Sequence, residues 1–132
     1  LETIRGLKEG RITERLQRDA EATYAPILKK EDGQIDWNQP AKEIERRVRA
    51  FTPWPSAYTH WKGHLIKVHR AELINKETGA APGEVVRADG EGLWVATGQG
   101  VLGLQEVQQE NRKRMPAPEF VRGARIKVGE KF

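Results

Sequence analysis

The sequence has no cysteine and no long hydrophobic run, and both absences restrict what the chain can be. Without cysteine, its 132 residues can form no disulfide and lack the ligand that structural zinc sites use most often. No apolar stretch approaches the roughly 20 residues of a membrane-spanning helix, and no signal-peptide pattern opens the chain. The first residue is Leu1 where translation would begin with Met. We therefore expect a cytosolic piece of a longer protein, without a membrane partner.

Recognisable catalytic and metal-binding patterns are also missing. There is no glycine-rich phosphate loop, no nucleophile elbow and no constrained pair of histidine and carboxylate. Asp32 and Asp36 lie in a polar segment, where they are expected to cap or form turns. A glycine turn between His60 and His64 should keep them from converging on a metal, and His69 has no evident acidic partner. We predict no catalytic residue and no metal site.

Positive charge is present in modest excess but is unevenly distributed. The formal net charge is +4, with a pI near 9.5. Residues 41–76 carry eight Lys and Arg against three Asp and Glu, and residues 106–132 carry seven against four. Residues 77–105 are acidic, with one against four, and residues 1–40 have seven against eight. If folding joins the two basic blocks, they form a face suited to phosphates; otherwise they form an unevenly charged solvated surface.

The sequence up to Pro53 predicts two helices separated by a linker. Leu1, Ile4 and Leu7 form one stripe of a short helix that ends at Gly10, whereas residues 11–34 are polar and broken by proline and glycine. A second helix is expected to follow the N-cap Asn38, with Pro40 in its first turn, and to stop before Pro53. Its apolar face consists of Ala41, Ile44, Val48 and Phe51.

The rest of the chain predicts short strands separated by glycine turns, which is typical of a small closed or nearly closed β-barrel. A helical turn is expected over residues 116–123. The expected strands are residues 58–61, 65–73, 84–88, 93–96, 101–107 and 125–128, with turns at Gly63, Asp89-Gly90 and Gly98-Gln99-Gly100.

The tryptophans admit a structural and a functional interpretation. Trp54 lies between Pro53 and Pro55, which restrict the backbone, so its ring could offer a stacking platform for a base. The favoured interpretation is that it anchors a turn onto the core, as we also expect for Trp37 and Trp94. Trp61, with His60 and a lysine beside it, is the tryptophan expected to be exposed.

The basic cluster Arg112-Lys113-Arg114 is the sharpest local signal for a binding surface. It precedes Met115-Pro116 in an expected loop, where long cationic side chains can reach a partner. Together with Lys62, Lys67 and Arg70 it could form a track for a phosphate backbone, with binding that weakens steeply as salt is added. The alternative is a loop that only promotes solubility.

Several motifs in combination resemble the C-terminal part of the methionyl-tRNA formyltransferase family. No single one is specific, but their order from residue 22 to the end is. Thr52 and Asn111 depart from the pattern, which has asparagine and glycine there; asparagine tolerates the left-handed backbone that a loop can require. The motifs are Ala22-Thr23-Tyr24-Ala25-Pro26, Lys30-Glu31-Asp32, Ile35-Asp36-Trp37, Arg49-Ala50-Phe51-Thr52-Pro53-Trp54-Pro55, Pro82-Gly83, Ala96-Thr97-Gly98, Leu104-Gln105-Glu106, Arg112-Lys113-Arg114-Met115, Glu119-Phe120-Val121-Arg122-Gly123 and Gly129.

The resemblance implies a mainly β fold with short helices. Residues 1–21 would be the last helix of a Rossmann-like catalytic domain, residues 22–37 a basic linker, and residues 38–132 an OB-like β-barrel domain. The parent enzyme would transfer a formyl group from 10-formyltetrahydrofolate to methionine on initiator tRNA, in the bacterial cytoplasm or an organelle. The catalytic motifs of that N-terminal domain are absent, so this chain should be inactive alone and hold no cofactor.

The resemblance also implies the partners and the site. The partners would be initiator Met-tRNA and the chain's own N-terminal catalytic domain, with the protein a monomer. Contacts to tRNA would be mostly to the backbone, so sequence discrimination should be poor. The first candidates for these contacts are Lys29, Lys30, Arg112, Lys113 and Arg114, and the second, on charge alone, are Lys62, Lys67 and Arg70.

Two alternatives have a different function. The chain could be the accessory domain of a related formyltransferase acting on a sugar nucleotide or folate, where the barrel would serve packing, orientation or oligomerisation. It could also be a generic OB-type binder of single strands. The second alternative is weakened because the expected strands lack evenly spaced aromatic residues on which bases would stack.

Overall fold

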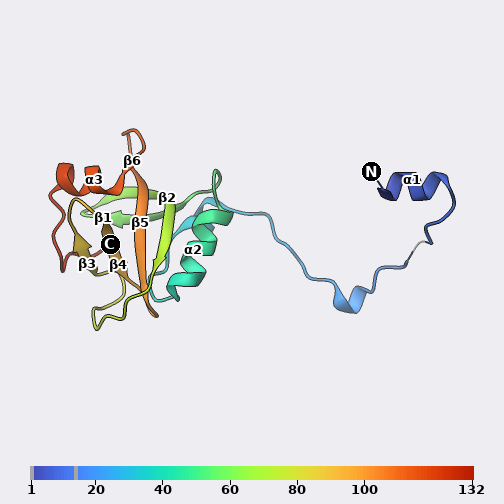
Figure 1. Ribbon diagram of the computed structural model, residues 1–132, viewed down its shortest axis with the longest axis horizontal. Coiled ribbons are helices and arrows are strands. Elements are labelled where there is room, and N and C mark those ends of the chain that lie inside the picture. The colour runs from blue at the N-terminus through green and yellow to red at the C-terminus, as the bar shows by residue number, and fades with distance from the viewer. Residues whose placement is uncertain (1, 14) are drawn as a thin grey trace.

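The computed structural model describes residues 2–13 and 15–132. Near the N-terminus lies helix α1 (Glu2–Lys8), which an extended, exposed segment separates from the sheet domain (Figure 1). Ile4 and Leu7 of α1 are more than half exposed. The apolar stripe expected on this helix is therefore uncovered in the part of the chain that the structure describes. None of the described helices combines the length and apolarity needed to cross a membrane.

A six-stranded antiparallel sheet forms the centre of the fold, with the order β1-β2-β5-β4-β3 and β6 paired to β5 (Figure 1). The prediction of a mainly β fold with short helices is confirmed, whereas OB-like closure into a barrel stays a prediction. The strands are β1 (Ala57–Trp61), β2 (His64–Ile74), β3 (Val85–Ala88), β4 (Leu93–Ala96), β5 (Val101–Gln109) and β6 (Met115–Pro116).

The β1–β2 hairpin shows how residue type fixes the register. Trp61 pairs with His64, so Lys62 and Gly63 form a two-residue turn in which both residues have positive φ, 48° and 81°. Such a turn matches the right-handed twist of the strands, and glycine adopts it without strain. The predicted turn at Gly63 is confirmed. This register decides which side chains of β2 face the core.

Helix α2 (Ala41–Ala50) packs on the sheet through its predicted apolar face. Ala41, Ile44 and Val48 are buried, and the helix ends before the prolines, as predicted. The predicted N-cap was wrong: Pro40 occupies that position. Asn38 instead donates its backbone N–H and its side-chain amide to Asp36 Oδ1, 3.0 and 2.9 Å away, because it lies in the turn before the helix.

The C-terminal end corrects two predictions. Helix α3 (Ala117–Ala124) has eight residues and so exceeds the single turn expected there; its Ala117, Phe120 and Val121 are buried. The strand expected over residues 125–128 does not form, because Arg125 ends the helix in the left-handed conformation at φ 55°. The chain meets β3 only afterwards, where Val85 N–H donates to the Glu130 carbonyl at 2.8 Å.

The hydrophobic core lies between the sheet, α2 and α3, and the chain begins to pack on it at Gly33. A Cβ there would collide with the carbonyl oxygen of Ser56, so only glycine permits this approach. Two residues later Ile35 N–H donates to the Tyr58 carbonyl at 2.8 Å, and Trp37 is buried. The division into residues 1–21, 22–37 and 38–132 stays a prediction.

Candidate nucleic-acid interface

A row of side chains crosses the exposed face of strands β1, β2 and β5. The register pairs Tyr58 with Lys67, and Lys67 with Gln108. Because side chains alternate along a strand, the fully buried Ile66 and Val68 on either side leave Lys67 on the exposed face. Paired residues on antiparallel strands project to the same face, so the row is continuous across three strands.

The row continues into the β5–β6 loop through Gln108. Its side-chain amide Nε2 donates to the backbone carbonyl of Arg112 at 2.8 Å, while its Oε1 accepts a hydrogen bond from His69 Nε2 at 3.0 Å. Arg112, Lys113 and Arg114 are all exposed in this loop, as predicted. The hydrogen bond from Gln108 therefore attaches the loop to β5, while its three cationic side chains remain exposed.

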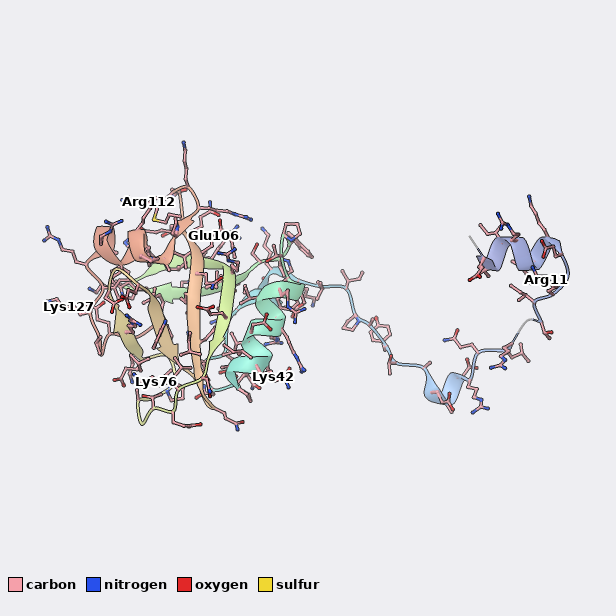
Figure 2. All side chains as sticks on the ribbon, viewed as in Figure 1. Arg11, Lys42, Lys76, Glu106, Arg112 and Lys127 are labelled. Atoms are coloured by element: carbon pink, nitrogen blue, oxygen red, sulfur yellow. The ribbon has the colours of Figure 1, made fainter. Side chains whose placement is uncertain are left out.

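Arg70 and Arg114 face a single carboxylate. The register pairs Arg70 with Glu106, and Arg114 Nη1 lies 4.0 Å from Glu106 Oε2. Figure 2 shows Glu106 and Arg112 at the same end of the domain, far from Lys42 and Lys76. One carboxylate cannot neutralise two guanidinium groups, so this part of the surface keeps a net positive charge.

The segment that carries Lys29 and Lys30 meets the same row at its other end. Gln34 forms a parallel bridge with Tyr58, at the edge of the sheet. Asp32 Oδ2 accepts a hydrogen bond from Lys29 N–H at 2.7 Å, which confirms that Asp32 is a turn residue. The exposed cations thus form a series from the linker across the sheet to the loop, which we call the basic band: Lys29, Lys30, Lys67, Arg70, Arg112, Lys113 and Arg114.

Lys62 does not belong to the basic band. Its Nζ lies 3.0 Å from Glu130 Oε1 and 4.5 Å from the ring centroid of Trp61. The hydrogen bonds from Lys62 and from the Trp61 indole lower the pKa of Glu130, so the lysine has a matched counterion. It also lines a groove of about 460 Å³ along α3, to which only Arg112 of the basic band contributes.

Two of the predictions about the tryptophans were wrong, those for Trp61 and Trp54. Trp61, which we expected to be exposed, is 6% exposed and packs edge-on to Phe120 at 5.9 Å because its strand position faces the core. Trp54, which we favoured as a core anchor, is 54% exposed and lies in the turn between α2 and β1. Trp37 is buried as predicted, with its indole donating to Thr59 Oγ1 at 3.1 Å.

Trp94 is only half-buried, so the prediction that it is a core residue holds in part. Arg87 lies 4.6 Å and Lys76 5.8 Å from its ring centroid, in a cation–π arrangement on the sheet surface. It belongs to β4, on the far side of β5 from Lys67. Trp94 therefore contributes nothing to the basic band.

The remaining titratable candidates have local roles. His64 Nδ1 lies 3.1 Å from Glu110 Oε1, and His60 packs edge-on to Tyr58. Hydrogen bonds from Asn38 lower the pKa of Asp36, which confirms its turn role. Residues 2–13 and 15–132 contain no group of three histidines or carboxylates that could hold a metal ion. The basic band presents fixed cations, which attract anions.

The residues that support the basic band were not predicted from the sequence. Tyr58 and Gln108 connect its parts, but neither carries charge, and only the strand register reveals that they flank Lys67. The alternation of Ile66, Lys67 and Val68 was visible in the sequence and could have placed the lysine on the exposed face.

Comparison with known proteins defines the class. A family model described as "Formyl transferase, C-terminal domain" matches residues 27–125, and the chain belongs to this family. It is similar to methionyl-tRNA formyltransferase of Solibacter usitatus, with 47% identity over all 132 residues, and of Desulfotalea psychrophila, with 44% over 126 residues, or 96% of the chain. It spans 42% and 39% of their lengths. The resemblance to the C-terminal part of the methionyl-tRNA formyltransferase family is confirmed.

Solved structures give the same fold at lower identity. The chain superposes on a variant of HypX from Aquifex aeolicus with a TM-score of 0.68 and 20% identity, covering 98% of this chain and 23% of that one. A structure of HypX in complex with tetrahydrofolic acid gives a TM-score of 0.67 with the same identity. At this identity the likeness concerns the fold alone.

Proposed function

We propose that this chain is the tRNA-binding portion of a methionyl-tRNA formyltransferase. The observation that carries the proposal is the basic band, which runs from Lys29 across β2 to Arg114. Among the described residues, only Arg114 of this band has a carboxylate within 4.0 Å of its cationic group, namely Glu106. Cations without a carboxylate partner, held in one series along the linker, the sheet and the loop, suit the phosphates of a nucleic acid backbone.

The whole enzyme would formylate methionine carried by initiator tRNA, with 10-formyltetrahydrofolate as donor, in the cytoplasm of a bacterium. Catalysis would belong to an N-terminal domain, and this chain alone would be inactive. The exposed stripe of Ile4 and Leu7 on α1 would pack against that domain, which explains an apolar face without a cover. The enzyme would act as a monomer whose C-terminal domain orients the tRNA.

The salt dependence of tRNA binding tests the proposal. If the seven cations of the basic band each neutralise one phosphate, a plot of log K against log salt should have a slope between about −4.9 and −6.3. Replacing Arg112, Lys113 and Arg114 together by alanine should lower the affinity and reduce the slope by about 2 to 3. Fluorescence anisotropy with initiator tRNA, at salt concentrations from about 50 to about 200 mM, measures the affinity and the salt slope of each variant.

A matched triple variant controls for net charge. Lys42, Lys76 and Lys127 are exposed lysines away from the β5–β6 loop (Figure 2), and their replacement by alanine removes the same charge. This control should keep the wild-type slope. Equal losses for both triples would indicate attraction by net charge alone and remove the loop from the site. Absence of binding at low salt would instead favour the accessory domain of a formyltransferase with a small substrate.

A further inference from the structure

Trp54 is the one tryptophan of the described chain that the fold leaves open to solvent. Trp37 and Trp61 are buried, and Trp94 is covered by Arg87 and Lys76, whereas Trp54 is 54% exposed. Burying a large aromatic ring is strongly favourable, so a protein gains by covering it unless the ring has an external partner. From the sequence, Trp54 could be a core anchor or a stacking platform for a base, and its exposure excludes the core anchor.

The loop that carries Trp54 is closed by its own hydrogen bonds. Ser56 N–H donates to the Phe51 carbonyl at 2.9 Å, and Ser56 Oγ donates to the Pro53 carbonyl at 2.8 Å. Thr52 Oγ1 donates to the carbonyl of Val48 in the last turns of α2 at 2.8 Å. The backbone beside the ring is therefore fixed before any partner binds, which reduces the entropy that binding would cost.

Cations of the basic band lie on both sides of this loop. On one side, Gly33 packs against the Ser56 carbonyl, which brings in the segment that begins with Lys29 and Lys30. On the other side, Thr52 shares the wall of a cavity of about 220 Å³ with Arg70 and with residues of α2. The loop thus lies where the linker cations and the sheet cations approach each other.

One further cation is held beside the loop by an ion pair. Arg49, from the last turn of α2, lines the same cavity as Thr52 and bonds to Glu45 Oε1 at 3.1 Å. Arg47 lies 5.9 Å from the ring centroid of Phe51, at the start of the loop. An exposed aromatic ring on a loop that has cations on its flanks is complementary to a nucleotide, whose base stacks while its phosphates meet the cations.

We propose that Trp54 stacks on an unpaired base of the tRNA whose backbone follows the basic band. This inference rests on the proposed function and adds a specific contact to it. Stacking accepts any base, because each one has a π-face, and it releases no counterions. It therefore contributes affinity for RNA that contains unpaired nucleotides, without contributing to the salt slope.

The test compares the wild-type chain with Trp54→Ala on two RNAs, initiator tRNA and a blunt-ended RNA duplex that has no unpaired base. The expected loss of affinity for tRNA is about fivefold to 150-fold, with an unchanged salt slope. Affinity for the duplex should not change. Trp54→Phe should recover part of the loss, because phenylalanine keeps a smaller face for stacking.

Leu73→Ala is the matched control, because Leu73 is 51% exposed and lies at the far end of β2. It should bind both RNAs as the wild type does. Wild-type affinity of Trp54→Ala for tRNA, or equal losses for tRNA and duplex, would overturn the stacking contact and leave the tRNA-binding function intact. Failure of the wild-type chain to bind either RNA would overturn both proposals.

Discussion

At the scale of single residues, His69 shows how burial removes a titratable cation from a basic surface. Its Nε2 donates to Gln108, and its buried Nδ1 has no hydrogen-bond partner among the described residues. Burial, chiefly, lowers the pKa of His69, and the nearby Arg114 and Lys67 act in the same direction. The histidine therefore stays neutral near pH 7 and supports the loop through Gln108, while the charge of the band comes from lysine and arginine.

The lowered pKa predicts that stability falls in mild acid. Above about pH 6.5, the usual value for histidine, the side chain is neutral in both the folded and the unfolded chain. As the pH falls below that value, the unfolded chain binds a proton that the folded chain resists, so unfolding becomes easier. His69→Gln should lose less stability than the wild type between pH 7.5 and about 5.5, as measured by urea unfolding at each pH.

His60→Gln is the control for this prediction, because His60 is exposed at the surface of β1. It should keep the wild-type pH dependence. Glu106 is the carboxylate that opposes the effect by raising the pKa of His69, and it is unchanged in both variants. Equal pH dependence in His69→Gln and wild type would mean that the lowered pKa of this histidine does not affect how stability changes with pH.

At the scale of elements, the β5–β6 loop depends on one residue with an unusual backbone. Asn111 has a φ of 60°, and it stands where the family resemblance leads us to expect glycine. Asparagine visits this left-handed region more readily than other side-chain-bearing residues, so the departure from the pattern is mild, as predicted. The loop can therefore present Arg112 and its neighbours without glycine.

Substitution at position 111 should follow the backbone rule. Asn111→Ala is expected to destabilise the chain by about 1 kcal/mol, because a Cβ without a compensating polar group is disfavoured there, while Asn111→Gly should stay within about 0.5 kcal/mol of the wild type. Lys113→Ala, a neighbouring exposed position without positive φ, should also be near neutral. Denaturant unfolding measures all three, and equal stability of the alanine and glycine variants at 111 would contradict the argument.

Elements with strong periodicity were predictable from the sequence, and those decided by their surroundings were not. The apolar spacing of Ala41, Ile44 and Val48 predicted the buried face of α2, and the alternating strands were found with small shifts. The strand expected over residues 125–128 was wrong, since Ile126 is buried by packing after a helix that ends at Arg125. Hydrophobicity predicted burial there, but not the backbone conformation.

At the scale of the whole molecule, the stability of the domain resides in the residues after the linker. Every member of the hydrophobic core follows residue 34, whereas the described residues before Gly33 are exposed apart from Gly6. Deleting residues 1–26 should therefore change the free energy of unfolding by less than about 0.5 kcal/mol. It should also leave tRNA affinity within about twofold, because Lys29 and Lys30 remain and twofold is well under 1 kcal/mol.

A longer deletion provides the contrast. Removing residues 1–36 also removes the contacts of Gly33, Gln34 and Ile35 with the start of β1 and with the loop before it. This variant should unfold at a lower denaturant concentration and bind tRNA more weakly. A large loss of stability from the shorter deletion would show instead that the extended segment packs on the domain in solution.

The sequence by itself determined the family, the mainly β class, the exposed basic loop and the turn roles of Asp32 and Asp36. These depend on local spacing and residue chemistry, which act over a few positions along the chain. Only the tertiary structure decided that Lys67 and Arg70 share a face with that loop while Lys62 pairs with Glu130, and that Trp54 is exposed while Trp61 is buried. Those outcomes depend on strand register and on packing between residues far apart in the chain, which composition and periodicity do not specify.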